Sequence, residues 1–162
     1  MCRCTPNIRT PFCGKPGCEW PAREPISIEV KSFDQMAHKD VTLLATLGWV
    51  ENVEHGLSSG ELNSHYSYKA FVAYVDGAPV GVVTWEKLGS SNRLWINQSY
   101  VKPEFRRRGV YTKMWEYVVE KAKELKVFEI ASGTHPNNAE MRAVAKKLGR
   151  TETGIIMSMK VG

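Results

Sequence analysis

The most informative part of the chain reads Val101-Lys-Pro-Glu-Phe-Arg106-Arg107-Arg108-Gly109-Val110-Tyr111. It joins a predicted strand, Leu94–Val101, directly to a predicted helix that begins near Val110. The first N–H groups of a helix lack helical acceptors, and the helix dipole adds partial positive charge at that end. Three arginines supply further charge, and the glycine lets a ligand approach the backbone, so the stretch favours an anion such as a pyrophosphate. Taken alone, an arginine run before a helix is equally compatible with solvated surface.

The sequence that follows this loop has helical periodicity. Apolar residues recur at helical spacing over Val110–Leu125, and Val127–Ala131 then has the composition of a strand. Asn137 and Glu140 have the spacing of a capping box and predict another helix, which Gly149 would end.

Strands are also predicted before and after these helices along the chain. Asp76-Gly77 lies between two β-rich runs, Phe71–Val75 and Val80–Trp85. Because both turn positions tolerate positive φ, this pattern predicts a hairpin. Near the end of the chain, the alternation of Thr153–Val161 predicts a last strand.

The first third of the predicted domain begins with a strand and a helix. Ile26–Val30 alternates apolar and polar residues, and Ser32 with Gln35 has capping-box spacing ahead of a helical pattern that Gly48 would end. Residues 49–68 predict a short helix and a loop. The whole order predicts an α+β fold, with a mixed, mostly antiparallel sheet flanked by helices.

Length and composition predict one globular domain preceded by an arm. The chain has 162 residues, 43% of them hydrophobic, which suits a single core over residues 26–162. Residues 1–25 hold five of the eight prolines and read as irregular. There is no apolar run long enough for a membrane span and no apolar segment of a secretory signal, so we expect a cytoplasmic protein.

The arm contains all four cysteines: Cys2, Cys4, Cys13 and Cys18. Four thiols this close together can bind Zn²⁺ tetrahedrally, and a metal would supply the energy to order a proline-rich segment. Free thiols are the main alternative, since the spacing is not that of two-residue knuckles. A disulfide is the least favoured in a reducing compartment.

The net charge of +5 and the pI of about 9.0 are modestly basic. A patch for a phosphate-rich cofactor, an acidic protein partner or a nucleic acid would each produce this balance. Charge therefore excludes none of these partners.

The sequence resembles the GNAT superfamily of acetyl-CoA-dependent N-acetyltransferases. Arg106–Tyr111 fills their Arg/Gln-x-x-Gly-x-Gly/Ala signature, and Tyr100–Glu104 matches the lead-in that precedes it. The hairpin Phe71–Trp85 and the helix from Asn138 to Leu148-Gly149 match in order, so the likeness covers about residues 26–161.

The resemblance implies that acetyl-CoA enters a gap where two neighbouring strands separate. The pantetheine arm would pair with the open strand edge around Gln98–Val101, and the pyrophosphate would lie on the backbone of Arg106–Thr112. A backbone N–H near Val101 would polarise the thioester carbonyl. The implied cofactor-binding residues are Tyr100, Val101, Arg106, Arg107, Arg108, Gly109, Val110, Tyr111, Thr112 and Asn138.

The chain departs from the family pattern at two positions. Tyr111 stands where a small residue normally lets a phosphate approach, and Ala145 stands where many relatives carry an acid tyrosine. Glu129 and His135 are the candidate general bases. Each residue also has an interpretation without a catalytic role, because strands often carry a solvent-facing Glu and loops often carry an exposed His.

The resemblance predicts direct transfer of an acetyl group to an amine of a small molecule, a protein or an aminoacyl-tRNA. The two departures leave open a catalytically inactive binding module that acts through its basic face and its cysteine arm. A nucleic-acid-binding zinc protein is the weakest reading, because it rests on charge and cysteines alone.

Overall fold

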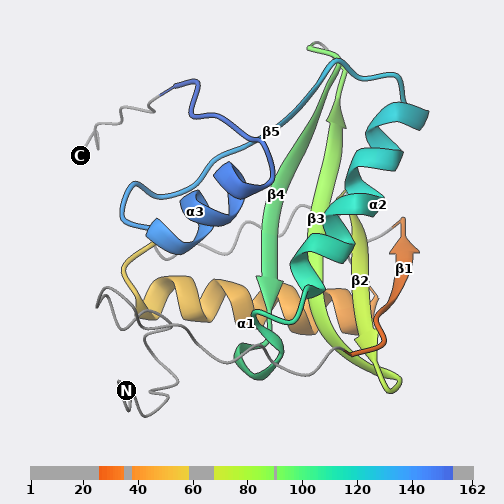
Figure 1. Ribbon diagram of the computed structural model, residues 1–162, viewed down its shortest axis with the longest axis vertical. Helices are drawn as coiled ribbons and strands as arrows, with labels where there is room; N and C mark the ends of the chain where they lie inside the picture. The colour runs from red at the N-terminus through yellow and green to blue at the C-terminus, as the bar shows by residue number, and fades with distance from the viewer. Residues whose placement is uncertain (1–25, 35–37, 59–67, 90, 155–162) are drawn as a thin grey trace.

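The computed structural model describes residues 26–34, 38–58, 68–89 and 91–154 (Figure 1). Within them five strands form one sheet in the order β1-β2-β3-β4-β5, with three α-helices and one short 3₁₀ turn. The elements are β1 (Glu29–Phe33), α1 (Lys39–Glu54), β2 (Lys69–Val75), β3 (Ala78–Leu88), β4 (Arg93–Val101), the 3₁₀ turn (Pro103–Phe105), α2 (Val110–Glu124), β5 (Glu129–Ser132) and α3 (Ala139–Lys147).

The sheet is mixed, as predicted. The first four strands pair antiparallel in chain order, whereas β5 pairs parallel to β4. The predicted hairpin is the β2–β3 turn, where Asp76 has φ 50° and Gly77 has φ 78°. Two successive positive φ values fit the right-handed twist of the flanking strands. The prediction of an α+β fold is confirmed.

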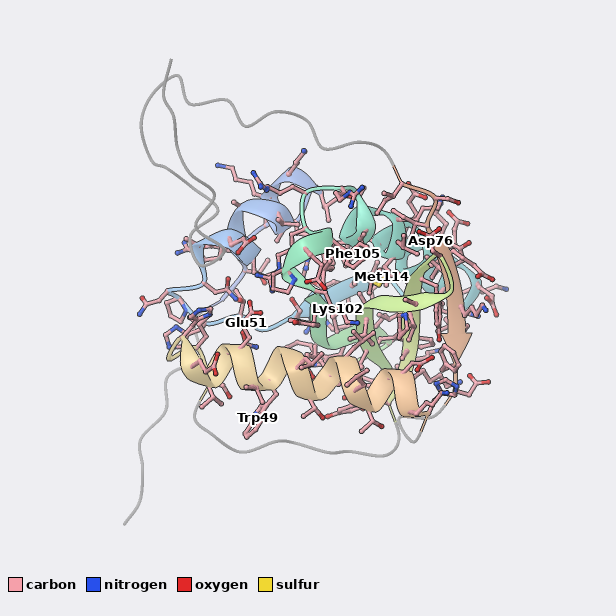
Figure 2. The ribbon with its side chains drawn as sticks, turned by 90° about the horizontal axis from the view of Figure 1, so that it is seen from below. Trp49, Glu51, Asp76, Lys102, Phe105 and Met114 are labelled. Atoms are coloured by element: carbon pink, nitrogen blue, oxygen red, sulfur yellow. The ribbon has the colours of Figure 1, made fainter. Side chains whose placement is uncertain are left out.

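Helices cover both faces of the sheet, and β2 shows why. Its alternate residues Phe71, Ala73 and Val75 join the core cluster under α2, where Met114 and Val118 are fully buried. The residues that alternate with these along the strand join a second cluster, under α1: Ala70, Val72 and Tyr74. A strand buried on both faces needs apolar residues at every position, and β2 has them after Lys69. Figure 2 shows α1 and α2 on opposite sides of the sheet.

The prediction that Gly48 ends the first helix is wrong. α1 continues to Glu54, and Gly56 with φ 65° follows it. Gly48 is instead a buried contact with β4, because a Cβ there would lie 2.8 Å from both Gln98 Nε2 and Tyr100 Cβ. The glycine is needed for close packing, which sequence spacing cannot distinguish from a helix end.

The start of α1 also differs from the prediction. His38 caps the helix by accepting the Asp40 N–H on its Nδ1 at 3.3 Å. Ser32 lies in β1, and its predicted partner Gln35 lies outside the described residues. The predicted strand at Ile26–Val30 is observed slightly later, as β1.

The cap of α3 is shifted by one residue from the prediction. Asn138, not Asn137, holds the cap, and its Oδ1 accepts the Met141 N–H at 3.0 Å. Gly149 with φ 79° ends α3 as predicted. Of the predicted last strand, Thr153 and Gly154 are not in strand conformation, and residues 155–162 lie outside the described part.

Two further predictions concern a zinc site in the cysteine arm and the lack of a membrane-spanning segment. The arm of residues 1–25, with its four cysteines, lies outside the described residues, so the zinc hypothesis stays a prediction. Among the residues that are described, no three His, Cys, Asp or Glu side chains gather as a metal site requires. None of the described helices has the length and apolar character to span a bilayer.

Candidate cofactor site

The strands β4 and β5 separate partway along β4. They pair only from Arg93–Glu129 to Ile96–Ser132. Beyond Ile96, no described strand pairs with β4 on this side, although β3 still pairs with it up to Val101 on the other. A bulge marks the point of separation, since Trp85 pairs with Ile96 and Thr84 with Gln98, which leaves Asn97 without an opposite residue. We call the open edge of β4 from Asn97 to Val101 the fork.

Beyond the fork, a short loop leads to a row of backbone amides without helical acceptors. After the 3₁₀ turn the chain reaches Arg107 with φ 59° and Gly109 with φ 80°, and α2 begins. The first helical bond runs from Lys113 N to Gly109 O at 2.9 Å, so the N–H groups of Gly109–Thr112 have no helical acceptor. A Cβ added at Gly109 would meet nothing within 4 Å. We call these four amides the cradle; N–H groups without acceptors at a helix start are common partners of bound anions in proteins.

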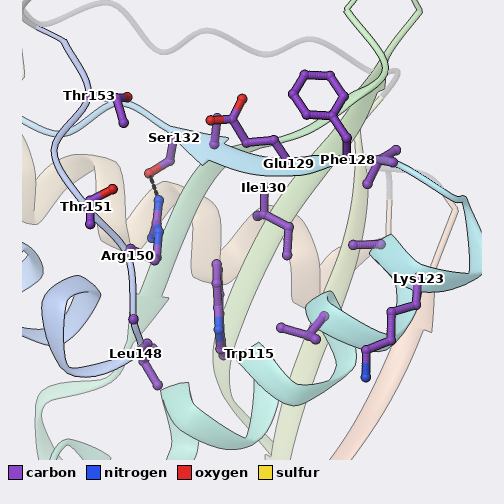
Figure 3. Close-up of a pocket in the computed structure, with 15 residues that line it drawn as sticks. Trp115, Lys123, Phe128, Glu129, Ile130, Ser132, Leu148, Arg150, Thr151 and Thr153 are labelled. Carbon is purple, nitrogen blue, oxygen red and sulfur yellow. Dashed lines mark hydrogen bonds between the residues drawn. The ribbon is translucent and has the colours of Figure 1, made fainter.

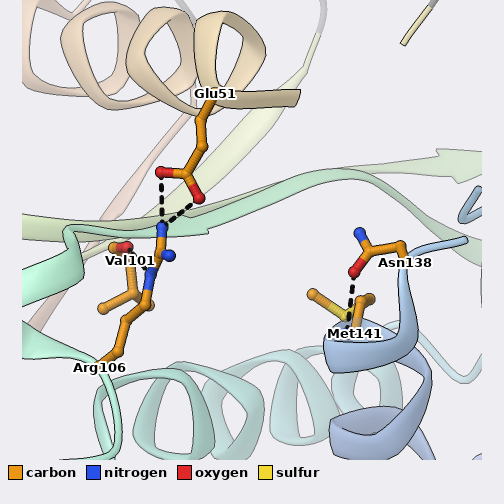
Figure 4. A network of polar contacts seen from close by, with 5 residues as sticks. All are labelled: Glu51, Val101, Arg106, Asn138 and Met141. Atoms are coloured by element: carbon orange, nitrogen blue, oxygen red, sulfur yellow. Dashed lines mark hydrogen bonds and ion pairs between the residues drawn. The ribbon is translucent and has the colours of Figure 1, made fainter. Parts of the chain in front are cut away.

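Arg106 does not carry free charge to the cradle. Its guanidinium donates to both carboxylate oxygens of Glu51 on α1, at 2.6 and 2.7 Å, and its Nε donates to Val101 O at 2.9 Å (Figure 4). Figure 2 shows Glu51 pointing inward from α1, whereas Trp49 points away. Arg106 therefore fastens α1 to the end of β4. Of the other arginines in the run, Arg107 is exposed and Arg108 is half-buried.

This ion pair predicts a measurable coupling in stability. Each side chain is about a quarter exposed, so the pair is partly screened by solvent. We expect Arg106→Ala and Glu51→Ala each to lower the free energy of unfolding by about 1–2 kcal/mol, with a coupling of about 1 kcal/mol in the double variant. Urea unfolding of the four proteins measures it. Additive losses would show that the contact contributes nothing.

The remaining residues of the predicted cofactor motif have different surroundings. Val110 is buried in the core and Thr112 is exposed, so each can offer a ligand only its backbone or, for Thr112, its hydroxyl. Tyr100 packs its ring under the Arg106 guanidinium, 5.7 Å away, and burial raises the pKa of its phenol, with the nearby Glu51 charge acting in the same direction. Asn138 uses its Oδ1 as the α3 cap.

Tyr111 turns its side chain toward the fork. Its ring packs beside Trp115, with centroids 6.3 Å apart, and its hydroxyl lies close to Ser99 of β4 and to Arg150. Burial raises the pKa of this phenol more than the Arg150 charge lowers it. The bulky residue therefore lies beside the open strand edge, and the space around Gly109 stays clear.

The two predicted bases lie at opposite ends of β5. Glu129 pairs with Arg93 Nε at 2.5 Å, at the end where β4 and β5 are joined. His135 lies in the loop beyond Ser132, on the open side. Its Nδ1 accepts the Asn137 N–H at 3.2 Å, which leaves Nε2 as the nitrogen that can exchange protons with a ligand.

Sequence reasoning missed Arg150, which follows the helix-ending Gly149. Figure 3 shows its guanidinium directed at Ser132, the last residue of β5 that pairs with β4. Arg150 also borders a pocket of about 450 Å³ between α2, β5 and the chain after α3. In the sequence, the one feature that distinguishes this arginine is its position directly after a helix-ending glycine.

A family model described as the acetyltransferase (GNAT) family matches residues 40–149, more than half of the chain. The chain belongs to the GNAT acetyltransferase family. The match includes the fork, the cradle and α3. The resemblance drawn from the sequence is thus confirmed at the level of the family, while the curated proteins contain no match to the chain.

Solved structures share the GNAT fold at low sequence identity. An aminoglycoside N-acetyltransferase AAC(6′)-Iy in complex with CoA is 20% identical, with a TM-score of 0.64 over 85% of this chain and 97% of that one. A ribosomal-protein-alanine N-acetyltransferase from Brucella melitensis biovar Abortus 2308 is 15% identical, with a TM-score of 0.65 over 83% and 100%. An aminoglycoside acetyltransferase from an uncultured soil metagenomic sample is 22% identical, with a TM-score of 0.62 over 85% and 100%.

Proposed function

We propose that this GNAT domain transfers the acetyl group of acetyl-CoA to an amine by direct attack. One observation carries the proposal: the edge of β4 that no described strand pairs is followed, after a single 3₁₀ turn, by the cradle of amides without helical acceptors. An extended arm that ends in a diphosphate has matching needs, namely backbone partners along its length and N–H donors at its charged end.

In this proposal the pantetheine arm lies along Gln98–Val101 and the diphosphate on the cradle. The arginines at positions 107 and 108 add positive charge beside it. The amine then meets a thioester held at the fork, so positioning supplies much of the rate enhancement. The carbonyl oxygen would be stabilised by a backbone N–H near Val101.

The acceptor is an amine on a small molecule or a protein. Among the structural neighbours, AAC(6′)-Iy is described with a bisubstrate analogue, CoA-S-monomethyl-acetylneamine, and the Brucella enzyme is named for a ribosomal protein alanine. Both of these enzymes are named for acetylation of a nitrogen atom. A screen for this chain should therefore contain aminosugars as well as peptide N-termini and lysines.

His135 is the better placed of the two candidate bases, since Glu129 is neutralised by Arg93 at the joined end of the strands. We expect His135→Gln to lower kcat about tenfold, because water can relay part of the proton transfer. We expect Glu129→Gln to stay within about twofold. Steady-state kinetics with the best acceptor measures both, and equal losses in the two variants would contradict the assignment.

The first experiment is calorimetric titration with acetyl-CoA, followed by release of free CoA thiol over the amine panel. Saturable binding with acceptor-dependent thiol release supports the enzyme. Binding without release on any acceptor would favour a catalytically inactive module. No binding of acetyl-CoA would remove the proposal. Nucleic-acid binding that needs no CoA and weakens steeply with salt would instead support the nucleic-acid reading.

A further inference from the structure

The side chains of Tyr111, from α2, and Arg150, from the chain after α3, lie close together beside the fork. The Tyr111 hydroxyl is buried near Ser99 and the Arg150 guanidinium, yet it makes no hydrogen bond of good geometry with either. Ser99 belongs to the open part of β4. The phenol thus reaches the strand edge at which the pantetheine arm is proposed to lie.

The backbone fixes where the Arg150 side chain starts. α3 ends in a Schellman motif: Gly149 N donates to Lys146 O, and Arg150 N donates to Ala145 O, both at 3.0 Å. The guanidinium donates to the Ser132 hydroxyl and lies over the Trp115 ring at 4.9 Å (Figure 3). These contacts hold it where β4 and β5 begin to separate.

Arg150 differs from three other arginines of the domain. Each of those faces a carboxylate: Arg93 faces Glu129, Arg106 faces Glu51 and Arg142 faces Glu152. No carboxylate within the described residues pairs with Arg150, although it is half-buried.

The fork therefore contains donors whose acceptors are incomplete. A half-buried cation without a carboxylate partner and a buried phenol without a hydrogen-bond acceptor are each costly, so a complete site would supply acceptors to both. Burial moves the pKa of Tyr111 further above neutral pH, so the protonated phenol can act as a donor. A third buried donor, Asn97 Nδ2, also lacks a partner among the described residues, and Asn97 is the bulged residue where the fork opens.

We propose that the side chains of Tyr111 and Arg150 bind the amide carbonyls of the pantetheine arm. The arm has two amide carbonyls, so it offers the acceptors that this part of the fork lacks. The proposal rests on the function proposed above and adds side-chain contacts to the backbone contacts expected there. It gives Tyr111 a role of its own in place of the small residue that the family motif expects.

The test compares coenzyme A with 3′-phosphoadenosine 5′-diphosphate, which is coenzyme A without its pantetheine arm. Tyr111→Phe and Arg150→Gln remove single donors. Tyr117→Phe on α2 and Arg142→Gln on α3 are matched controls, since both residues are more exposed. Calorimetry with each ligand gives the dissociation constants, and thermal unfolding checks that each variant folds.

We expect Tyr111→Phe to weaken coenzyme A binding about fivefold and Arg150→Gln about tenfold, with the diphosphate fragment unchanged within twofold. Variants that bind coenzyme A like the wild type would overturn the inference while leaving the proposed function intact. Equal weakening of both ligands would also overturn it, because it would indicate a displaced loop. A wild-type protein that binds neither ligand would remove both proposals.

Discussion

Gly109→Glu is expected to weaken coenzyme A binding at least about 100-fold while the domain stays folded. The substitution places a carboxylate in the open space beside the cradle, where a Cβ meets nothing within 4 Å. The new charge repels a diphosphate and competes with it for the amides of Gly109–Thr112. Calorimetric titration of both proteins measures the change.

The control for this experiment is Gly77→Glu. Gly77 has φ 78° and Gly109 has φ 80°, and at neither position would an added Cβ have a neighbour within 4 Å. Both variants therefore carry the same charge and a similar backbone strain of about 1–2 kcal/mol. Only the variant at the cradle should lose binding. If Gly109→Glu binds within threefold of the wild type, the diphosphate does not lie on the cradle.

Gly48→Ala is expected to lower the free energy of unfolding by about 2 kcal/mol. Helix propensity alone predicts the opposite sign, a gain of about 1 kcal/mol for replacing a glycine inside a helix. The added methyl would lie 2.8 Å from Tyr100 Cβ, and an atom attached to the β4 backbone cannot move aside cheaply. α1 must therefore shift away from β4, which also strains the hydrogen bond from Gln98 Nε2 to Ala45 O at 2.7 Å.

Thermal and urea unfolding distinguish the two signs, with a fall of about 4–8 °C in Tm expected for Gly48→Ala. Thr46→Ala in the same helix is the control, since it raises helix propensity and adds no atom. If Gly48→Ala proves more stable than the wild type, α1 does not pack on β4 as closely as the structure has it. Because Tyr100 lies at the fork, the variant should also bind coenzyme A less tightly.

Much of the architecture follows from local patterns. The Asp76-Gly77 turn, the apolar face of Val110–Glu124 and the end of α3 at Gly149 were predictable because each depends on residues close together in the chain. The helix start within the motif Arg106–Tyr111 is confirmed as well, whereas the anion site at that start stays a prediction. The same local reasoning placed the α3 cap one residue early, because adjacent asparagines are equivalent by composition.

The roles of individual site residues were not predictable in this way. The sequence predicts Arg106 as a phosphate ligand, yet Glu51, 55 positions away, accepts two of its three side-chain hydrogen bonds. The sequence predicts Glu129 as a candidate base, but the register of β4 and β5 places Arg93 beside it. The sequence could not predict that Arg150 lies beside the fork, because its neighbours Ser132 and Trp115 belong to other elements.

The sequence by itself determined the family and most of the elements with their order, because turn chemistry, periodicity and helix ends are local properties of the chain. Only the tertiary structure decided which charges are neutralised, which glycine serves close packing and which side chains enter the fork. These depend on strand register and on the crossing of α1 over β4, and both arise from contacts between residues far apart in the chain.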